Sequence, residues 1–257
     1  MTTTASVEQV YAYLALSAAL AAVWTVLYVV RADLRRAMMP VSLGTMLLGL
    51  TEPLFVPEYW NPPTLWNLAR RTGFDLESLL FSFAIGGIVF AAYHALFGVA
   101  PSESMAHERS HRRHRYHLLV VLSAPLLFAL LLALTGLNPI YASAIALVGG
   151  FLATLYCRPD LWLKMIVSGG FFLALYFVVF GLFNLAFPGY VAAVWNLGAI
   201  SGRLLLGVPL EELMFAFTFG LYWSSVYEHL VWRRSPSPQR RIAGPPRAAR
   251  DIRANES

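Results

Sequence analysis

Long apolar runs alternate with short polar segments along most of the chain. They cover residues 10–30, 37–50, 76–97, 118–135, 140–157, 161–187 and 204–226. Most of them reach the roughly 20 residues that a helix needs to cross the hydrocarbon of a bilayer. The second run is short and contains Pro40, and the fifth is marginal, so six spans remain an alternative to seven. The pattern predicts an all-α integral membrane protein with about seven transmembrane helices.

Composition agrees with this pattern. Apolar residues make up 58% of the chain and charged residues only 13%, against roughly 25% charged residues in an ordinary soluble domain. The nine residues before the first run contain one Glu and no Lys or Arg. Because a secretory signal peptide carries a basic flank there, we expect the first run to be retained as a helix.

The basic residues predict an orientation, because Lys and Arg near membrane crossings stay mainly on the cytoplasmic side. With seven spans and an external N-terminus, 16 of the 19 basic residues fall on the cytoplasmic side. Those 16 are Arg31, Arg35, Arg36, Arg109, Arg112, Arg113, Arg115, Arg158, Lys164 and the seven arginines of the tail. Arg70, Arg71 and Arg203 are external. We expect a protein of the cytoplasmic membrane with its C-terminus inside the cell.

The high isoelectric point comes from the end of the chain. Residues 233–257 hold seven Arg and two acidic residues, a charge of +5 that equals the net charge of the whole chain. This Pro- and Arg-rich segment is predicted to be a disordered tail near anionic lipid headgroups, and not a nucleic-acid surface. The single cysteine, Cys157, excludes an internal disulfide and argues against a cysteine-based metal site.

Polar landmarks recur in the same order in the two halves of the chain. Arg31 and Asp33 return as Arg158 and Asp160, Gly49 as Gly181, Trp60-Asn61 as Trp195-Asn196, the sequence FDLESLLF (74–81) as VPLEELMF (208–215), and Gly86 as Gly220. We therefore expect two parallel three-helix repeats, 1–97 and 136–232. A basic loop and linking helix at 98–135 would join them, and 233–257 would follow as the tail. Such repeats commonly place a binding site between the halves.

Carboxyl groups beside apolar runs are the candidates for chemistry, since a charged side chain at the centre of a membrane helix costs about 2.5–3.5 kcal/mol on insertion scales. Glu211 and Glu212 open the last run after Pro209, which suits a first helical turn. A buried pair of this kind is a plausible proton donor, with helix capping as the alternative. Glu77 opens the third run and Glu52 ends the second. We expect the remaining boundary carboxyls among the lipid headgroups: Glu58, Asp75 and Glu228.

Several familiar chemistries find no support in the sequence. There is no G-x-G-x-x-G fingerprint for a flavin or nicotinamide site. The only lysine, Lys164, lies near a helix end, which argues against a retinal Schiff base. The histidines show no metal-binding pattern: His107, His111, His114 and His117 belong to a basic loop that we expect to be solvated, and His94 and His229 stand apart.

The motif PLEELMF at 209–215, preceded by Trp195-Asn196 and repeated in degenerate form upstream, resembles the flavin-free, small-membrane-protein lycopene cyclases. That family pairs two three-helix domains, as separate subunits or fused by a linking helix, with a Pro-x-Glu-Glu/Asp motif at a helix start. The resemblance covers most of residues 10–230. At 75–78 the first half reads Asp-Leu-Glu-Ser, without the proline and the second acid. The motif also resembles the intramembrane Glu-Glu proteases, but Ala216 stands where those have Arg.

The resemblance implies a redox-neutral, proton-initiated cyclisation of a lycopene-like polyene, without metal or other cofactor. It implies Glu211 or Glu212 as the general acid, the other as its base or electrostatic partner, and Glu77 as a supporting acid. Substrate contacts would come from Trp60, Trp195, Pro209, Phe215 and Phe81, although interfacial anchoring is an equal alternative for the tryptophans. Membrane lipids and other carotenoid enzymes are further expected partners. The alternatives are a non-catalytic carotenoid- or partner-binding module, or another acid-catalysed terpenoid-converting enzyme.

The distribution of basic residues predicts that reporter fusions after Arg115 and after Arg234 both report a cytoplasmic location. The measurement is a pair of reporters, one active only inside the cell and one only outside. An external signal at either position would reject the seven-span assignment together with the parallel arrangement of the halves.

Overall fold

The computed structural model describes residues 7–99 and 115–233; the basic loop, with His107, His111 and His114, and the tail after Arg233 lie outside this part of the chain. Helices make up most of it. They are α1 (Val7–Val30), α2 (Arg35–Met46), η1 (Leu47–Leu54), η2 (Leu65–Asn67), α3 (Leu68–Thr72), α4 (Leu76–Phe97), α5 (His117–Val121), α6 (Ser123–Leu134), α7 (Pro139–Cys157), η5 (Pro159–Leu161), α8 (Trp162–Ala186), α9 (Tyr190–Val194) and α10 (Leu210–Val231). Two short antiparallel strands, β1 (Leu204–Leu205) and β2 (Val208–Pro209), form a hairpin ahead of α10.

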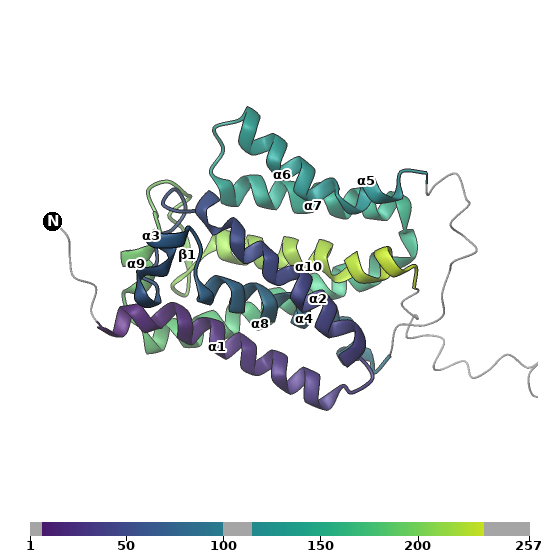
Figure 1. Cartoon of the computed structure of the whole chain (residues 1–257), viewed down its shortest axis with the longest axis horizontal. Coiled ribbons are helices and arrows are strands. Elements are labelled where there is room, and N and C mark those ends of the chain that lie inside the picture. The colour runs from purple at the N-terminus through teal and green to yellow at the C-terminus, as the bar shows by residue number, and fades with distance from the viewer. Residues whose placement is uncertain (1–6, 100–114, 234–257) are drawn as a thin grey trace, which may run out of the picture.

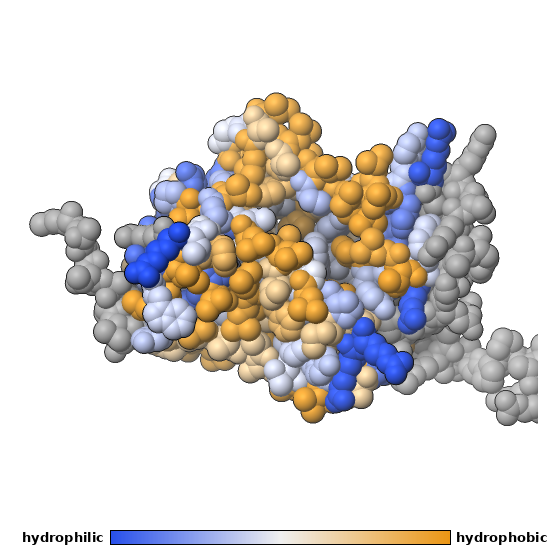
Figure 2. Space-filling view, viewed as in Figure 1, coloured by the Kyte–Doolittle hydropathy of each residue, from blue (hydrophilic) through white to orange (hydrophobic). Residues whose placement is uncertain are grey.

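Apolar side chains cover the outside of the helical bundle. Within the described residues, four stretches are long and apolar enough to cross a membrane: Val10–Val30, Leu76–Phe97, Pro139–Cys157 and Pro159–Ala186. Large aliphatic side chains such as Leu126, Leu130, Val178 and Leu182 are exposed on the helices. Figure 2 shows hydrophobic residues over the middle of the molecule and the most hydrophilic ones toward the two ends of its long axis. This is the surface expected of a membrane protein.

The long helices form two similar groups (Figure 1). In the first group α4 packs against both α1 and α2, and in the second α10 packs against both α7 and α8. The helix α6 lies on α7, while α4 also contacts α8 and α10. Each group thus has its third long helix at the centre, and these central helices join the two groups. The arrangement of seven spans in two repeats stays a prediction. Three of its seven segments, 37–50, 118–135 and 204–226, are not among the four stretches long and apolar enough to cross a membrane.

Those three segments differ from the continuous runs expected. The second is divided between α2 and η1, and the fourth between α5 and α6. The last begins later than expected, because residues 204–209 form the hairpin, with Gly207 at a positive φ of 83°. Pro209 has an extended ψ of 136° and stands at the N-cap of α10. It therefore precedes the first turn instead of lying in it.

Two glycines at matching positions allow each central helix to approach its neighbour closely. A Cβ atom on Gly86 of α4 would lie 2.0 Å from Oγ1 of Thr45 in α2. A Cβ atom on Gly220 of α10 would lie 2.7 Å from the Cα of Gly169 in α8. Small residues at such contacts are how membrane helices pack closely without help from water.

An arginine holds the end of the central helix in each group. Arg31 forms a two-pronged pair with Asp33 and donates to the carbonyls of His94 and Val99, at the end of α4. Hydrogen bonding from Arg31 lowers the pKa of the Asp33 carboxyl.

Arg158 repeats this pattern in the second group. It forms a two-pronged pair with Asp160 and donates to the carbonyls of Glu228 and Arg233, at the end of α10. In both groups the two carbonyls are five positions apart. The carbonyls of His94 and Glu228 also accept from the backbone amides that close each helix. The arginine adds a charged donor at this helix end, so the recurring Arg-x-Asp landmark has a structural task in each half.

At the opposite end of the bundle, two loops meet through their backbones. Trp60 and Trp195 form an isolated antiparallel bridge. The amide of Asn61 donates to the carbonyl of Val194 at 2.9 Å, and that of Asn196 donates to the carbonyl of Tyr59 at 2.9 Å. Each loop thus donates one hydrogen bond to the other and accepts one from it, at positions that match in the two halves. The two groups of helices are therefore joined around a local two-fold axis.

The close contact at Gly220 predicts that Gly220→Ala destabilises the protein by about 1–3 kcal/mol, because the added methyl group would overlap backbone atoms of α8. Thermal unfolding of the purified protein in detergent measures this. The matched control is Gly170→Ala on α8, where a Cβ meets nothing within 4 Å. Equal unfolding temperatures for the two variants would show that the helices separate freely at Gly220.

Candidate active site

An apolar cavity of about 330 Å³ lies between the two groups of helices. Its walls come from α1, η1, α4, α6, α7, α8 and α10 and from the two joined loops. On the face seen in Figure 2 the surface is hollowed between the α2–η1 segment and α6. Two carboxyl groups stand in this otherwise mainly apolar lining, those of Glu52 and Glu212.

The carboxyl group of Glu212 receives three hydrogen bonds. The hydroxyls of Tyr59 and Tyr176 donate to Oε1 and Oε2 at 2.5 and 2.6 Å, and Nε1 of Trp195 donates to Oε1 at 3.0 Å. Burial and the neighbouring Glu212 raise the pKa of the Tyr59 phenol, which keeps this group a donor. Donors of this kind stabilise a carboxylate where water is excluded. Glu212 is therefore equipped to carry negative charge in the cavity.

Glu211, the residue before Glu212 in the motif, has different contacts. Its carboxyl accepts from the hydroxyl of Tyr141 at 2.6 Å and from the amide of Ser201 at 2.9 Å, and it is not part of the cavity wall. The motif therefore directs one acid into the cavity and uses the other to hold α7 and the loop before the hairpin.

The two acids at the start of α4 also lie behind the cavity wall. One oxygen of Glu77 accepts from the amide of Leu65 at 2.8 Å, and Asp75 caps α4 by accepting from the amide of Ser78 at 2.6 Å. Neither carboxyl lines the cavity, whereas Ser78 does. Asp75 is completely buried, so its predicted place among the headgroups is wrong. Its capping bond makes this burial possible.

The second cavity acid is Glu52, which the sequence placed at the end of a span without a role. It is buried, and neither of its carboxyl oxygens has a hydrogen-bond partner within residues 7–99 and 115–233. The carboxyl groups of Asp75 and Glu77 are its acidic neighbours. An ionised Glu52 would face repulsion from them without a compensating donor, so burial favours the protonated acid. The available signal was a lone acid beside Pro53 in an apolar stretch.

Four of the five residues expected to contact substrate line the cavity: Trp60, Trp195, Phe81 and Phe215. The rings of the two tryptophans are 5.3 Å apart between centroids, and Tyr13 meets Trp60 edge-on at 4.7 Å. Pro209 is buried but stays outside the cavity wall. Its position at the N-cap of α10 suits a role in starting the helix.

A second buried group lies near the ends of α4 and α10. Glu228 accepts from Lys164, and His94 Nε2 lies 2.9 Å from the same carboxylate oxygen. Because all three side chains are at most 1% exposed, the headgroup location predicted for Glu228 is wrong. A nearby ammonium group makes the buried carboxylate tolerable. Glu58 is exposed, as expected for a boundary carboxyl.

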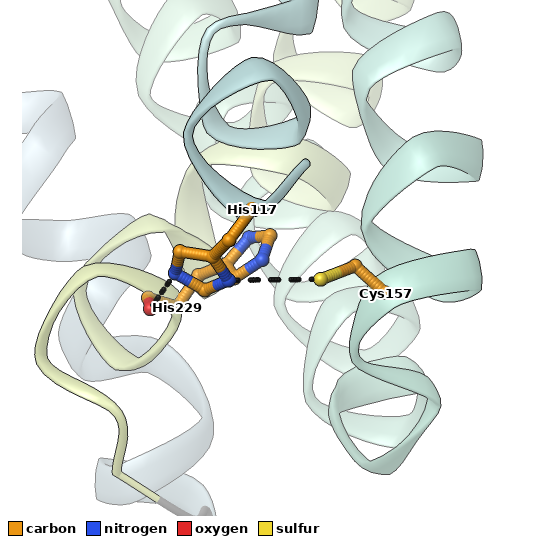
Figure 3. A group of neighbouring side chains, drawn as sticks. All are labelled: His117, Cys157 and His229. Atoms are coloured by element: carbon orange, nitrogen blue, oxygen red, sulfur yellow. Dashed lines mark hydrogen bonds between the residues drawn. The ribbon is translucent and has the colours of Figure 1, made fainter. Parts of the chain in front are cut away.

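The prediction of a solvated loop is also wrong for His117. This residue begins α5, and its ring stacks on Trp232 with centroids 4.1 Å apart. It lies beside Cys157 and His229, as Figure 3 shows. The sequence separates these three residues by 40 positions or more, so no spacing pattern could reveal the cluster.

Together, the apolar outer surface and the mainly apolar internal cavity with its two buried carboxyl groups are those of a membrane protein. Comparison with family models gives a match for part of the chain: residues 138–230, which hold α7, α8 and α10, match the family described as lycopene cyclase. The match covers the second group of helices. It indicates an enzyme that cyclises and a carotenoid polyene as substrate. Comparisons with curated proteins and with solved structures give no match.

The hydrogen bonds to Glu212 predict that Tyr176→Phe lowers the rate of cyclisation by about 10- to 100-fold, because a hydrogen bond to a charged group contributes about 1.5–3 kcal/mol. Initial rates with lycopene in detergent or liposomes measure this. The matched control is Tyr190→Phe, since the buried Tyr190 hydroxyl has no hydrogen-bond partner in the described part of the chain. A similar rate loss in both variants would point to general destabilisation.

Proposed function

We propose that this protein is a lycopene cyclase that closes a ring at an end group of a polyene held in the cavity, with Glu52 and Glu212 carrying the proton chemistry. The observation that carries the proposal is the presence of these two buried carboxyl groups in one mainly apolar cavity. A polyene offers only double bonds to react with. Redox-neutral ring closure at such bonds requires an acid, stabilisation of a cation and a base.

Glu52 is the general acid in this proposal. It is buried, neither of its oxygens accepts a hydrogen bond from a donor in the described residues, and its nearest charged-type neighbours are the carboxyl groups of Asp75 and Glu77, so the neutral carboxyl is the favoured form at rest. Adding its proton to the terminal double bond gives a tertiary cation. The electron pair of the neighbouring double bond then forms the ring bond and moves the positive charge into the ring.

Glu212 is the stabilising carboxylate and base. Burial opposes ionisation of Glu212, and its three donors counteract burial and stabilise the carboxylate. A carboxylate attracts the cation as it forms. Removal of a proton from a ring carbon by Glu212 creates the new double bond. The product has the composition of the substrate, Glu52 is left ionised and Glu212 protonated. A proton transfer between them restores the starting state, so no oxidant or reductant takes part and the reaction is an isomerisation.

The aromatic residues shape the space around this chemistry. The indole faces of Trp60 and Trp195 stabilise cationic character near Glu212, where cation–π attraction contributes about 0.5–2 kcal/mol. Phe81 and Phe215 occupy matching positions on α4 and α10 and line the polyene path. Glu77, Glu211 and Pro209 are positioning residues that hold loops and helix starts behind the wall. The resemblance alone implied Glu211 or Glu212 as the acid and Glu77 as a supporting acid, and the proposal differs in giving the acid role to Glu52.

We further propose that the chain arose by duplication and crosses the membrane seven times, with α5 and α6 as the linking segment and the N-terminus outside. Support comes from the matched arginine contacts, the reciprocal loop bridge and the matched glycines. In this arrangement the short elements α3, α9 and the hairpin lie on the external side. The cytoplasmic membrane is the proposed location.

This mechanism predicts that Glu52→Gln and Glu212→Gln each abolish ring formation, because the amide keeps the size of the side chain but removes its acid–base chemistry. General acid or base catalysis typically contributes about 10²- to 10⁴-fold in rate. Pigment analysis in a lycopene-accumulating host, alongside rates with purified protein, measures the effect. The matched control is Glu58→Gln, an exposed acid six positions from Glu52, which should retain wild-type product.

Glu77→Gln and Glu211→Gln provide an internal comparison. Their carboxyls contact backbone amides behind the wall, so these variants should unfold at lower temperature but keep more activity than the cavity variants. If Glu52→Gln and Glu212→Gln accumulate normally and still yield wild-type product, the cavity acids are structural. Unchanged lycopene with the wild-type chain would favour a carotenoid-binding module.

A further inference from the structure

We propose that His117, Cys157 and His229 form a binding site for a zinc-type divalent metal ion, separate from the cavity. The site lies where α5 begins and where α7 and α10 end (Figure 3). The three side chains each offer a ligand atom, and these atoms all lie within 4.8 Å of one another. Nitrogen and sulfur donors of this kind select zinc over magnesium or calcium.

The separation of the two best-placed ligand atoms fits a shared metal ion. Sγ of Cys157 lies 3.6 Å from Nδ1 of His117. Zinc binds sulfur at about 2.3 Å and imidazole nitrogen at about 2.0–2.1 Å, and tetrahedral geometry then places these two atoms about 3.6 Å apart. The His229 nitrogen needs an inward movement of about 1.4 Å at most to reach the same geometry, since tetrahedral nitrogen and sulfur ligands are about 3.4–3.6 Å apart.

The hydrogen bonding of His117 sets the correct nitrogen toward the site. Its Nε2 atom lies 2.9 Å from the backbone carbonyl of His229. A carbonyl oxygen only accepts, so Nε2 carries the hydrogen and Nδ1 presents its lone pair to Cys157. Metal-binding histidines almost always donate their second ring nitrogen in this way. This contact therefore leaves the nitrogen that faces Cys157 available as a ligand atom.

Packing around the cluster limits the movement of its ligands. The His117 ring stacks on Trp232 and stands at 90° to the His229 ring. Cys157 and His229 are each 1% exposed, while His117 is half-buried and offers a route for the ion. On binding, the Cys157 thiol releases its proton to solvent and binds as thiolate. The bound ion would fasten the start of α5 to the ends of α7 and α10.

The test uses the whole chain, purified in detergent with an affinity tag that contains no histidine, and titrated with Co²⁺. We expect one ion per chain and a thiolate-to-cobalt charge-transfer band that Zn²⁺ abolishes. Cys157 is the only cysteine, so the band can arise only from this residue. Cys157→Ser should remove the band, and His117→Ala and His229→Ala should each weaken binding by more than about 10-fold. Zn²⁺ should also raise the wild-type unfolding temperature.

The matched control replaces the other histidines of the neighbouring segment, His107, His111 and His114, with alanine together. This variant should keep the band and the stoichiometry. Absence of a charge-transfer band from the wild-type protein would overturn the proposal without any variant, leaving only a hydrogen bond between Cys157 and His117. Cobalt binding that survives Cys157→Ser but is lost in the triple-alanine control would overturn it as well.

Discussion

The burial of the Glu212 carboxyl in an apolar cavity is the constraint on which much of this structure depends. A carboxylate removed from water is tolerated only where donors replace the lost hydration. The donors come from three places: Tyr59 in a first-half loop, Tyr176 in α8 and Trp195 in a second-half loop. Tyr59 and Trp195 also belong to the joined loops. Solvation of one acid therefore requires both halves to be folded and in contact.

The two halves share a framework but differ in chemistry. Ser78 occupies the cavity position that corresponds to Glu212 in the aligned motifs, and Asn184 corresponds to Glu52 when Gly49 is matched with Gly181. Ser78 lines the cavity, whereas Asn184 stands outside its wall. Each half thus supplies one cavity acid from a different place in its sequence. In the proposed mechanism, Glu52 is the proton donor without hydrogen-bond donors of its own, and Glu212 is the carboxylate that accepts three hydrogen bonds. Two identical halves would give both acids the same surroundings, so they could not provide these two different roles in one cavity.

Apolar run length predicted most of the helices, because a helix that crosses hydrocarbon must satisfy its backbone within the segment. It could not predict the break between α2 and η1 or the hairpin before α10, which depend on local backbone geometry at Pro53, Gly207 and Pro209. The aromatic residues of the cavity wall were predicted together with the repeated motif. The place of Glu52 in that wall, the burial of Glu228 and the clustering of His117 with Cys157 and His229 could not be predicted, since each depends on contacts between segments far apart in the chain.

The bridge between the Trp60 and Trp195 loops is made by main-chain atoms, and this affects how the protein can evolve. Hydrogen bonds between amides and carbonyls do not depend on which side chains the residues carry. The exception is a substitution of Asn61 or Asn196 by proline, which would remove the donating N–H group. Loop residues other than Tyr59, Trp60 and Trp195 can change, and with them the surroundings of the cavity, while the backbone bridge is retained. Main-chain geometry thus keeps the two halves joined, and substrate preference can change at the neighbouring positions.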